Sequence, residues 1–527
     1  MKTLFTLVIT LLSGITMAQS PYTNIQISNQ NGPNEVSICI NPKNINQLVG
    51  GANLNSYYYS SNGGTNWTRG GLTSSSYGVW GDPCIIVDTN QHFYYFHLSN
   101  PSGGSWIDRI VCQKSTNAGV NWNNPGTYMG LNPPKDQDKE WGIVDWTGGP
   151  RGNWIYVTWT EFDVYGSSNT SDSSRILFSR STDGGNTWLA PVRLSKIGGN
   201  CIDEDYTTEG AVPAVGPNGE VYVAWSGPLA VNDFKIFFDK STDGGNTWLA
   251  NDIVAASQPG GWDYNIPGIQ RCNGLPITLC DISNGPYRGT IYINWTDEAG
   301  AGDHDVKVCK STNGGLNWSA PIRVNNDPPG KEQFFTWMTI DKATGFLYCV
   351  FYDRRNYTDN QTDVYLARST NGGSTWINER ISSSPFIPVS SVFFGDYNGI
   401  TAHNGRIRPM WTRLSGGSLS VWTALIDFPI GINPLSNEIP SRFRLEQNYP
   451  NPFNPMTNVK FQIPNEAFIK LIVFDALGRE ISTLVNEKLK AGIYDYQWDA
   501  SELPSGVYFY TMEADGYSDT KKMILIK

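Results

Sequence analysis

Residues 181–188 read Ser-Thr-Asp-Gly-Gly-Asn-Thr-Trp, and this turn sequence recurs along the chain. Five further copies follow the pattern Ser-x-Asp/Asn-x-Gly-x-x-Trp and begin at Ser60, Ser115, Ser241, Ser311 and Ser369. Asp or Asn can close such a turn onto its own backbone, and Gly supplies the positive φ that other residues resist. The copies lie 55 to 70 residues apart, which is the length of one four-stranded sheet with its loops. Repetition at this spacing predicts the blades of an all-β propeller.

A second repeat lies between these turns and sets the number of blades. It is a strand, a tight turn and another strand rich in Val, Tyr and Trp, as in residues 209–225, and it starts near Glu35, Asp82, Glu140, Glu209, Asn273, Phe334 and Asp396. The last repeat has neither a turn copy nor a fourth strand, whereas residues 22–28 read as an unassigned strand. Pairing the two ends would remove exposed sheet edges. We therefore expect seven blades, with six as the alternative.

The turn copies resemble the Asp-box, or BNR, repeat of sialidases and related β-propellers. Because they recur in six of the expected blades, we interpret them as scaffold and not as a site. The resemblance implies a glycan-active protein. One element of true sialidases is missing, because no Phe/Tyr-Arg-Ile-Pro motif precedes the first turn and no arginine triad can be identified.

Both ends of the chain carry features of an exported protein. Residues 1–18 hold one lysine, an apolar run and small residues, the pattern of a removable signal peptide. The propeller is expected over 19–432, followed by a linker at 433–442 and a small antiparallel β-sandwich at 443–527. The last segment contains Asn448-Tyr449-Pro450-Asn451-Pro452 and resembles the C-terminal sorting domain of the type IX secretion system. The resemblance implies a secreted or surface-attached protein that engages this machinery through 443–527.

The composition of the chain limits the classes of partner and cofactor that it can bind. A net charge of −10 argues against nucleic acid, and no stretch after the signal is long and apolar enough to span a membrane. The eight cysteines lack metal-ligand spacing, so no metal centre is expected, and the favoured disulfide joins Cys201 to Cys272. Residues 297–305 (DEAGAGDHD) could hold a structural Ca²⁺, although they lack the spacing of an EF-hand loop. No other cofactor is expected.

The candidate site follows from propeller geometry. Loops between strands 4 and 1 and between strands 2 and 3 share one face, where they converge over the central channel. This face would collect carboxylates, arginines and aromatics, a composition that suits a sugar, particularly one with an acid group. The expected catalytic residues are Asp396, Tyr397, Glu209 and Asp82, and the expected substrate-binding residues are Arg271, Arg354, Arg355 and Trp337.

Two functions follow from this arrangement. The first is a secreted, sialidase-like glycoside hydrolase that uses acid and base carboxylates at the channel mouth. The alternative is a non-catalytic propeller that binds a glycan or protein at the cell surface. The sequence leaves open whether the protein is an enzyme.

Overall fold

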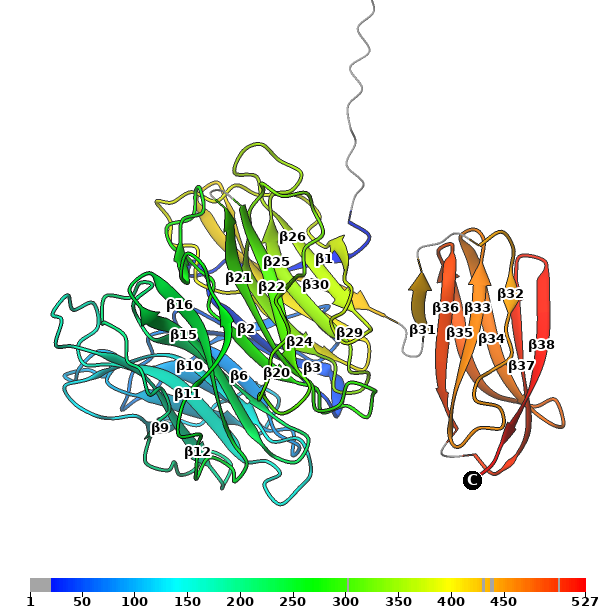
Figure 1. Cartoon of the computed structure of the whole chain (residues 1–527), viewed down its shortest axis with the longest axis horizontal. Coiled ribbons are helices and arrows are strands. Elements are labelled where there is room, and N and C mark those ends of the chain that lie inside the picture. The colour runs from blue at the N-terminus through cyan, green and yellow to red at the C-terminus, as the bar shows by residue number, and fades with distance from the viewer. Residues whose placement is uncertain (1–19, 301–302, 429–431, 437–439, 501–502) are drawn as a thin grey trace, which may run out of the picture.

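The computed structural model describes residues 20–300, 303–428, 432–436, 440–500 and 503–527. The expected signal peptide at 1–18 lies outside these residues. The described residues are all-β and form a large lobe followed by a small one (Figure 1). They contain no helix long and apolar enough to cross a membrane.

Seven four-stranded antiparallel sheets make up the described part of the large lobe. The first sheet contains β2 (Val36–Asn41), β3 (Asn44–Ala52), β4 (Ser56–Ser60) and β5 (Thr68–Gly71). The second contains β6 (Cys84–Val87), β7 (Phe93–Leu98), β8 (Ile110–Ser115) and β9 (Thr127–Met129). The third contains β10 (Asp136–Val144), β11 (Ile155–Phe162), β12 (Ser174–Ser181) and β13 (Val192–Arg193). The fourth sheet contains β14 (Glu209–Val215), β15 (Val221–Ala230), β16 (Asp233–Ser241) and β17 (Ile253–Ser257). The fifth contains β20 (Ile277–Cys280), β21 (Ile291–Gly300), β22 (Asp303–Ser311) and β23 (Ile322–Arg323). The sixth contains β24 (Gln333–Ile340), β25 (Leu347–Asp353), β26 (Asp363–Ser369) and β27 (Ile377–Arg380). A short pair, β18 (Asp263–Tyr264) and β19 (Cys272–Asn273), precedes β20.

The seventh sheet joins the two ends of the lobe. It consists of β28 (Gly399–His403), β29 (Arg406–Ser415), β30 (Ser418–Asp427) and, as its fourth strand, β1 (Thr23–Ser28). The N-terminal strand therefore completes the last sheet, as its sequence predicted. The first strands contact one another in chain order from β2 to β28, and β28 contacts β2, so the sheets surround a common axis.

Each eight-residue turn is closed by its own side chains. In the fourth sheet, the Ser241 hydroxyl accepts a hydrogen bond from the Gly245 amide at 2.7 Å and donates to Asp243 at 2.8 Å. Asp243 also accepts from the Thr247 amide at 2.9 Å, and Gly245 has a φ of 90°. These turns join strands 3 and 4. Because adjacent strands are antiparallel, the turns lie at the opposite end of the sheets from the loops between strands 2 and 3.

The small lobe is a β-sandwich with its own core. One sheet has the order β31 (Ile432–Ser436), β36 (Gly492–Asp499), β33 (Met456–Ile463), β32 (Arg444–Leu445); the other has β35 (Glu480–Leu489), β34 (Ala467–Asp475), β37 (Gly506–Ala514), β38 (Tyr517–Leu525). Its core includes Val459, Phe461 and Leu471, which are fully buried. The segment expected as a linker thus begins inside the sandwich, because β31 pairs with β36.

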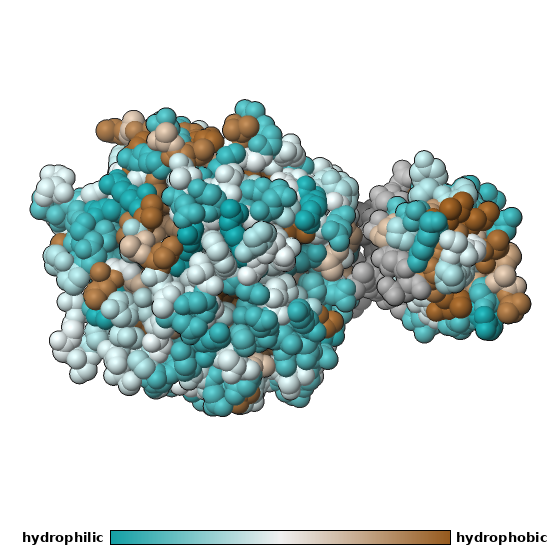
Figure 2. Space-filling model, turned by 90° about the horizontal axis from the view of Figure 1, so that it is seen from below, coloured by the Kyte–Doolittle hydropathy of each residue, from teal (hydrophilic) through white to brown (hydrophobic). Residues whose placement is uncertain are grey.

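The cysteine prediction was wrong: Cys201 and Cys272 are both free thiols, as are the other six. The backbone gives the two residues different partners, because Cys201 forms an isolated bridge with Ser167 in the loop after β11, while Cys272 pairs with Tyr264 in the β18–β19 ribbon. On the face shown in Figure 2 the large lobe is mostly hydrophilic, with hydrophobic side chains in small separate patches.

Candidate functional site

A repeated backbone irregularity marks the start of the inner strands. The strand pairing shifts register at the start of β10, β14 and β24, and Lys139, Gly210 and Phe335 lie in these shifts with φ of 53°, 77° and 49°. Glu35 and Asp82, just before β2 and β6, have φ of 47° and 52°. This conformation costs a non-glycine residue about 1–2 kcal/mol, and bulges of this kind redirect side chains near functional sites. Here they direct a repeated set of side chains to one end of the channel.

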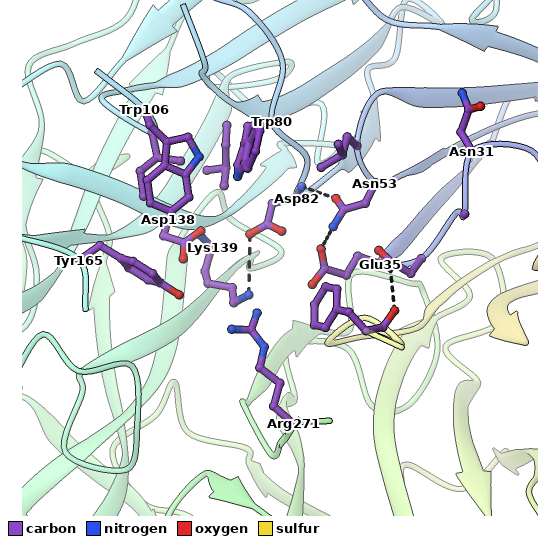
Figure 3. Close-up of a pocket in the computed structure, with 16 residues that line it drawn as sticks. Asn31, Glu35, Asn53, Trp80, Asp82, Trp106, Asp138, Lys139, Tyr165 and Arg271 are labelled. Atoms are coloured by element: carbon purple, nitrogen blue, oxygen red, sulfur yellow. Dashed lines mark hydrogen bonds and ion pairs between the residues drawn. The ribbon is translucent and has the colours of Figure 1, made fainter. Parts of the chain in front are cut away.

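A pocket of about 430 Å³ opens at this end, over the first three sheets (Figure 3). The loops before β6, after β7 and after β11 contribute Trp80, Trp106 and Tyr165. Trp106 contacts the other two rings edge-on, with centroids 5.8 Å apart in each pair. Trp80 and Trp106 are 37% and 42% exposed, unusually high for tryptophan. The pocket therefore has an aromatic wall that faces solvent.

Charged side chains line the rest of the pocket. The carboxyl groups belong to Glu35, Asp82 and Asp138, and the cations to Lys139 and Arg271. Lys139 and Arg271 also line a smaller cavity of about 130 Å³ next to it, together with Asp396. The two cations thus separate two hollows of the same mouth.

Asp396 anchors both cations. Its Oδ2 lies 2.7 Å from Lys139 Nζ, and it accepts a bidentate pair of hydrogen bonds from Arg271, with Nε at 2.9 Å from Oδ1. Arg271 Nη1 also donates to Asp203 at 3.2 Å, and Tyr165 donates to the same Asp203 oxygen at 2.6 Å. Burial alone would disfavour the carboxylate, but Lys139 and Arg271 outweigh it and hold the pKa of Asp396 below its usual value. Asp396 is therefore a fixed anion and no proton donor at neutral pH.

The pKa values of several neighbouring carboxyl groups are raised instead. Burial, and then the charge of Asp82, raise the pKa of Glu35 and of Glu140 well above the usual value. Burial also raises the pKa of Asp138 well above its usual value, assisted by Asp82 and opposed by Lys139. The pKa of Glu209 is raised by burial and by Asp203. The mouth therefore holds proton-bearing acids beside ionised ones, the arrangement that acid–base chemistry requires.

Three aromatic rings pack together in the channel beneath these charges. Trp141 lies 4.3 Å from Trp337 and 5.3 Å from Tyr397, centroid to centroid, and Trp337 and Tyr397 are 6.1 Å apart. Burial, and then the charge of Asp82, raise the pKa of Tyr397 well above its usual value. Trp337 was expected to bind substrate and Tyr397 to be catalytic. Both belong to a packed aromatic cluster that forms the floor of the mouth.

The structure brings together most of the residues that the sequence singled out. Asp396, Asp82, Tyr397, Trp337 and Arg271 all lie around the mouth. Glu209 lies beside them but is fully buried. Of the four expected catalytic residues, Asp82 alone lines the larger pocket.

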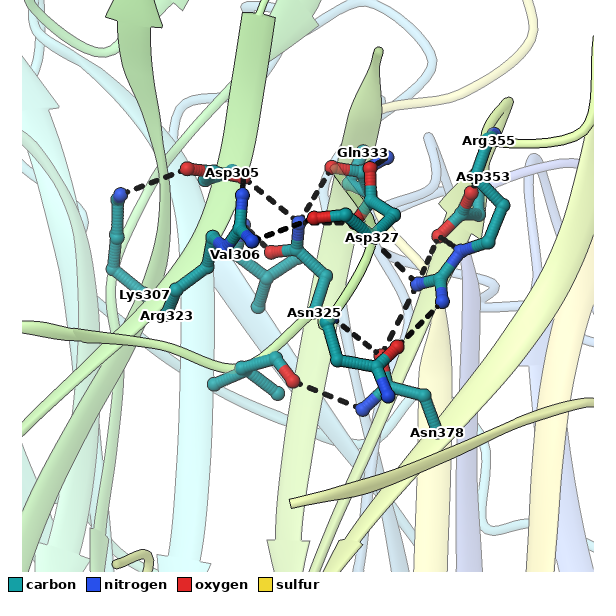
Figure 4. Close-up of polar contacts among 12 residues, drawn as sticks. Asp305, Val306, Lys307, Arg323, Asn325, Asp327, Gln333, Asp353, Arg355 and Asn378 are labelled. Carbon is teal, nitrogen blue, oxygen red and sulfur yellow. Dashed lines mark hydrogen bonds and ion pairs between the residues drawn. The ribbon is translucent and has the colours of Figure 1, made fainter. Parts of the chain in front are cut away.

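Arg354 and Arg355 do not line the mouth, which differs from their expected role. Arg354 is buried and donates to the carbonyl of Pro267 at 2.8 Å and to Thr362 at 3.1 Å. Arg355 belongs to a polar network between the fifth and sixth sheets, where its Nε donates to Asp353 at 2.9 Å (Figure 4). Both guanidinium groups therefore hold loops and sheets in place.

The same network contains one end of the segment considered for Ca²⁺. Asp305 faces Asp297 across the β21–β22 pair, and it accepts from Asn325 at 2.8 Å and from Lys307 at 3.0 Å (Figure 4). Residues 301–302 of this segment lie outside the described residues, and Ca²⁺ at 297–305 stays a prediction.

The sequence reasoning missed Lys139 and the aromatic wall of Trp80, Trp106 and Tyr165. Lys139 occupies the left-handed position of a bulge, which no sequence period marks. The tryptophans carried a usable signal, because Trp80 and Trp106 lie outside the turn pattern and in the loops that face the mouth.

Comparison with known proteins gives a clear result for the end of the chain. Residues 447–527 match the family model described as the secretion system C-terminal sorting domain. The small lobe is therefore a type IX sorting domain, and the protein is secreted or attached to the outer cell surface. No curated protein matches this chain.

Solved structures resemble the chain at low identity. A Dyadobacter fermentans protein of unknown function is 13% identical, with a TM-score of 0.44, and the match covers 66% of this chain and 94% of that one. A Hadza microbial sialidase is 14% identical, with a TM-score of 0.43 and coverage of 72% and 73%. Trypanosoma rangeli sialidase with the inhibitor DANA is 12% identical, with a TM-score of 0.41 and coverage of 96% and 89%.

Proposed function

We propose that this protein is an exported, seven-bladed propeller that acts on glycans, and that the pocket bounded by Trp80, Trp106 and Tyr165 is its glycan site. The observation that carries the proposal is the pairing of half-exposed tryptophan rings with buried carboxyl groups in one cavity. Aromatic rings provide flat, rigid, amphipathic contact area, which suits the faces of sugar rings. Carboxyl groups provide hydrogen-bond acceptors and donors for hydroxyl groups. The volume of about 430 Å³ lies in the ordinary range of ligand sites.

The reaction that fits these groups best is glycoside hydrolysis. Asp138, whose pKa is raised by burial, would donate a proton to the glycosidic oxygen as the bond to the anomeric carbon breaks. A water molecule would attack the anomeric carbon and lose a proton to the Asp82 carboxylate. Both carboxyl groups line the pocket, and Asp82 raises the pKa of Asp138 through its charge and a side-chain hydrogen bond. Lys139 would balance the charge of Asp82, since its Nζ lies 3.8 Å from Asp82 Oδ2.

The test is a hydrolysis screen of the full chain against neutral, acidic and amino polysaccharides. Asp138→Asn and Asp82→Asn should each lower turnover at least 100-fold on the substrate that is cleaved. Asp359→Asn is the matched control, because it removes one exposed carboxylate from a loop between strands 2 and 3. Wild-type turnover in both pocket variants would refute the catalytic assignment.

A second candidate is glycan binding without catalysis. It is favoured by the ion pairs of Asp396 with Lys139 and Arg271, which make part of the mouth a closed structural cluster. Saturable binding of a saccharide that releases no product would establish this function.

A further inference from the structure

The two cations of the pocket are already neutralised by protein carboxylates. Arg271 directs Nε and Nη2 at Asp396 and Nη1 at Asp203. The planar fork that would clamp a sugar carboxylate is therefore occupied. Lys139 Nζ lies 2.7 Å from Asp396 and 3.8 Å from Asp82, and only 8% of the residue is exposed. A carboxylate ligand would have to displace these partners from an almost fully buried amine.

The remaining charged groups of the pocket are acids. Glu35, Asp82 and Asp138 all line the cavity. Asn53 bridges two of them, since its amide nitrogen donates to Glu35 and its oxygen accepts from the Asp82 amide at 2.8 Å (Figure 3). The two cations face three acids, Asp82, Asp203 and Asp396, so the ion pairs of the mouth leave an excess of negative charge that repels anions and attracts cations.

The aromatic wall favours the same kind of ligand. A cation within about 6 Å of a tryptophan ring is attracted by the electrons of its face. Trp80 and Trp106 are the most exposed tryptophans of the described large lobe and lie at the rim of the cavity, beside Asp82 and Asp138. A ligand that combines a ring with an ammonium group could contact both walls at once.

We infer that the pocket is specific for an amino sugar with a free ammonium group, such as a glucosamine unit of a de-acetylated polysaccharide, and that it rejects acid sugars. This inference rests on the proposed function, because it names the substrate class of the same site. It reverses the expectation that the mouth suits a sugar with an acid group. A sugar ring offers a flat face that can lie against the tryptophan rings, whereas the narrow stem of a lysine side chain would leave them uncovered.

The experiment is calorimetric titration of the full chain with three tetrasaccharides of equal length: glucosamine, N-acetylglucosamine and galacturonic acid. The glucosamine oligomer should bind at least tenfold more tightly than the N-acetylated one, and the galacturonate should bind most weakly. Asp82→Asn should reduce the preference for glucosamine at least threefold. Asp359→Asn, which removes an exposed carboxylate on the same face, should leave the preference unchanged.

The other outcomes distinguish a failure of the amino-sugar specificity from a failure of the glycan site itself. Tighter binding of the galacturonate, or equal binding of the first two oligomers, would overturn the inference and leave the glycan site standing. No binding of any tetrasaccharide would overturn both. A lysine-rich peptide that binds more tightly than the glucosamine oligomer would overturn both in favour of a protein partner.

Discussion

The buried cation at the mouth offers the sharpest test of the electrostatic argument. Replacing Lys139 with Met keeps a long unbranched stem and the same left-handed backbone, so the change removes the charge and little else. Asp396 would lose its 2.7 Å partner and Asp82 its 3.8 Å partner. Removing one member of a buried ion pair typically costs about 3–5 kcal/mol. Because Arg271 still pairs with Asp396, we expect the lower end of this range, about 3 kcal/mol.

Tryptophan fluorescence during urea unfolding measures this loss, because all but Trp498 of the 19 tryptophans lie in the large lobe. Asp396→Asn should also destabilise the protein. The double variant Lys139→Met/Asp396→Asn should be more stable than the sum of the two losses predicts, by about 1–3 kcal/mol. A Lys139→Met protein within about 1 kcal/mol of wild type, or strictly additive losses, would refute the reasoning.

Four further expectations follow from the same structure. Glu209→Gln should raise stability at pH 8 relative to wild type by more than about 1 kcal/mol and change it little at pH 5. The pKa of Glu209 is raised in the folded wild type, so the stability of the wild type falls as pH rises above the unfolded pKa, about 4.3. Parallel pH profiles of the two proteins would contradict this. Trp80→Ala should weaken saccharide binding about tenfold and lower the unfolding free energy by about 1–2 kcal/mol, because part of the ring is buried against Trp106; unchanged affinity in a titration would count against the aromatic wall. Ser241→Ala should cost about 1–3 kcal/mol in a denaturant titration, since the buried Gly245 amide loses its acceptor, with no effect on saccharide affinity; a loss of affinity would argue against a purely structural turn. Deleting residues 20–28 should lower the Tm of the large lobe in calorimetry, because β30 would lose its partner β1 and become an exposed edge; an unchanged Tm would show that β1 does not close the last sheet.

The repeated parts of the fold could be predicted from the sequence because one physical requirement recurs. The turn at 241–248 needs a hydroxyl, an acid or amide and a glycine in fixed order, so each copy marks the end of a third strand. Chain closure through residues 22–28 followed from the unpaired last repeat and the cost of an open edge.

The site was less predictable, because its side chains are placed by irregular backbone. Sequence position put Arg354 and Arg355 in a mouth-facing loop, but it could not show that their guanidinium groups turn toward Pro267 and Asp353. Lys139 reaches Asp396 through a bulge, over a separation of 257 residues. The thiols of Cys201 and Cys272 stay apart because the backbone pairs these residues with different segments, at Ser167 and at Tyr264.

A crystal structure of the full chain with the glucosamine tetrasaccharide would show whether the mouth pocket binds a glycan. The account predicts a sugar ring against Trp80 and Trp106 with its ammonium group within hydrogen-bond distance of Asp82, Glu35 or Asp138. Saccharide density elsewhere on the propeller, with an empty mouth pocket in the same crystal, would contradict it.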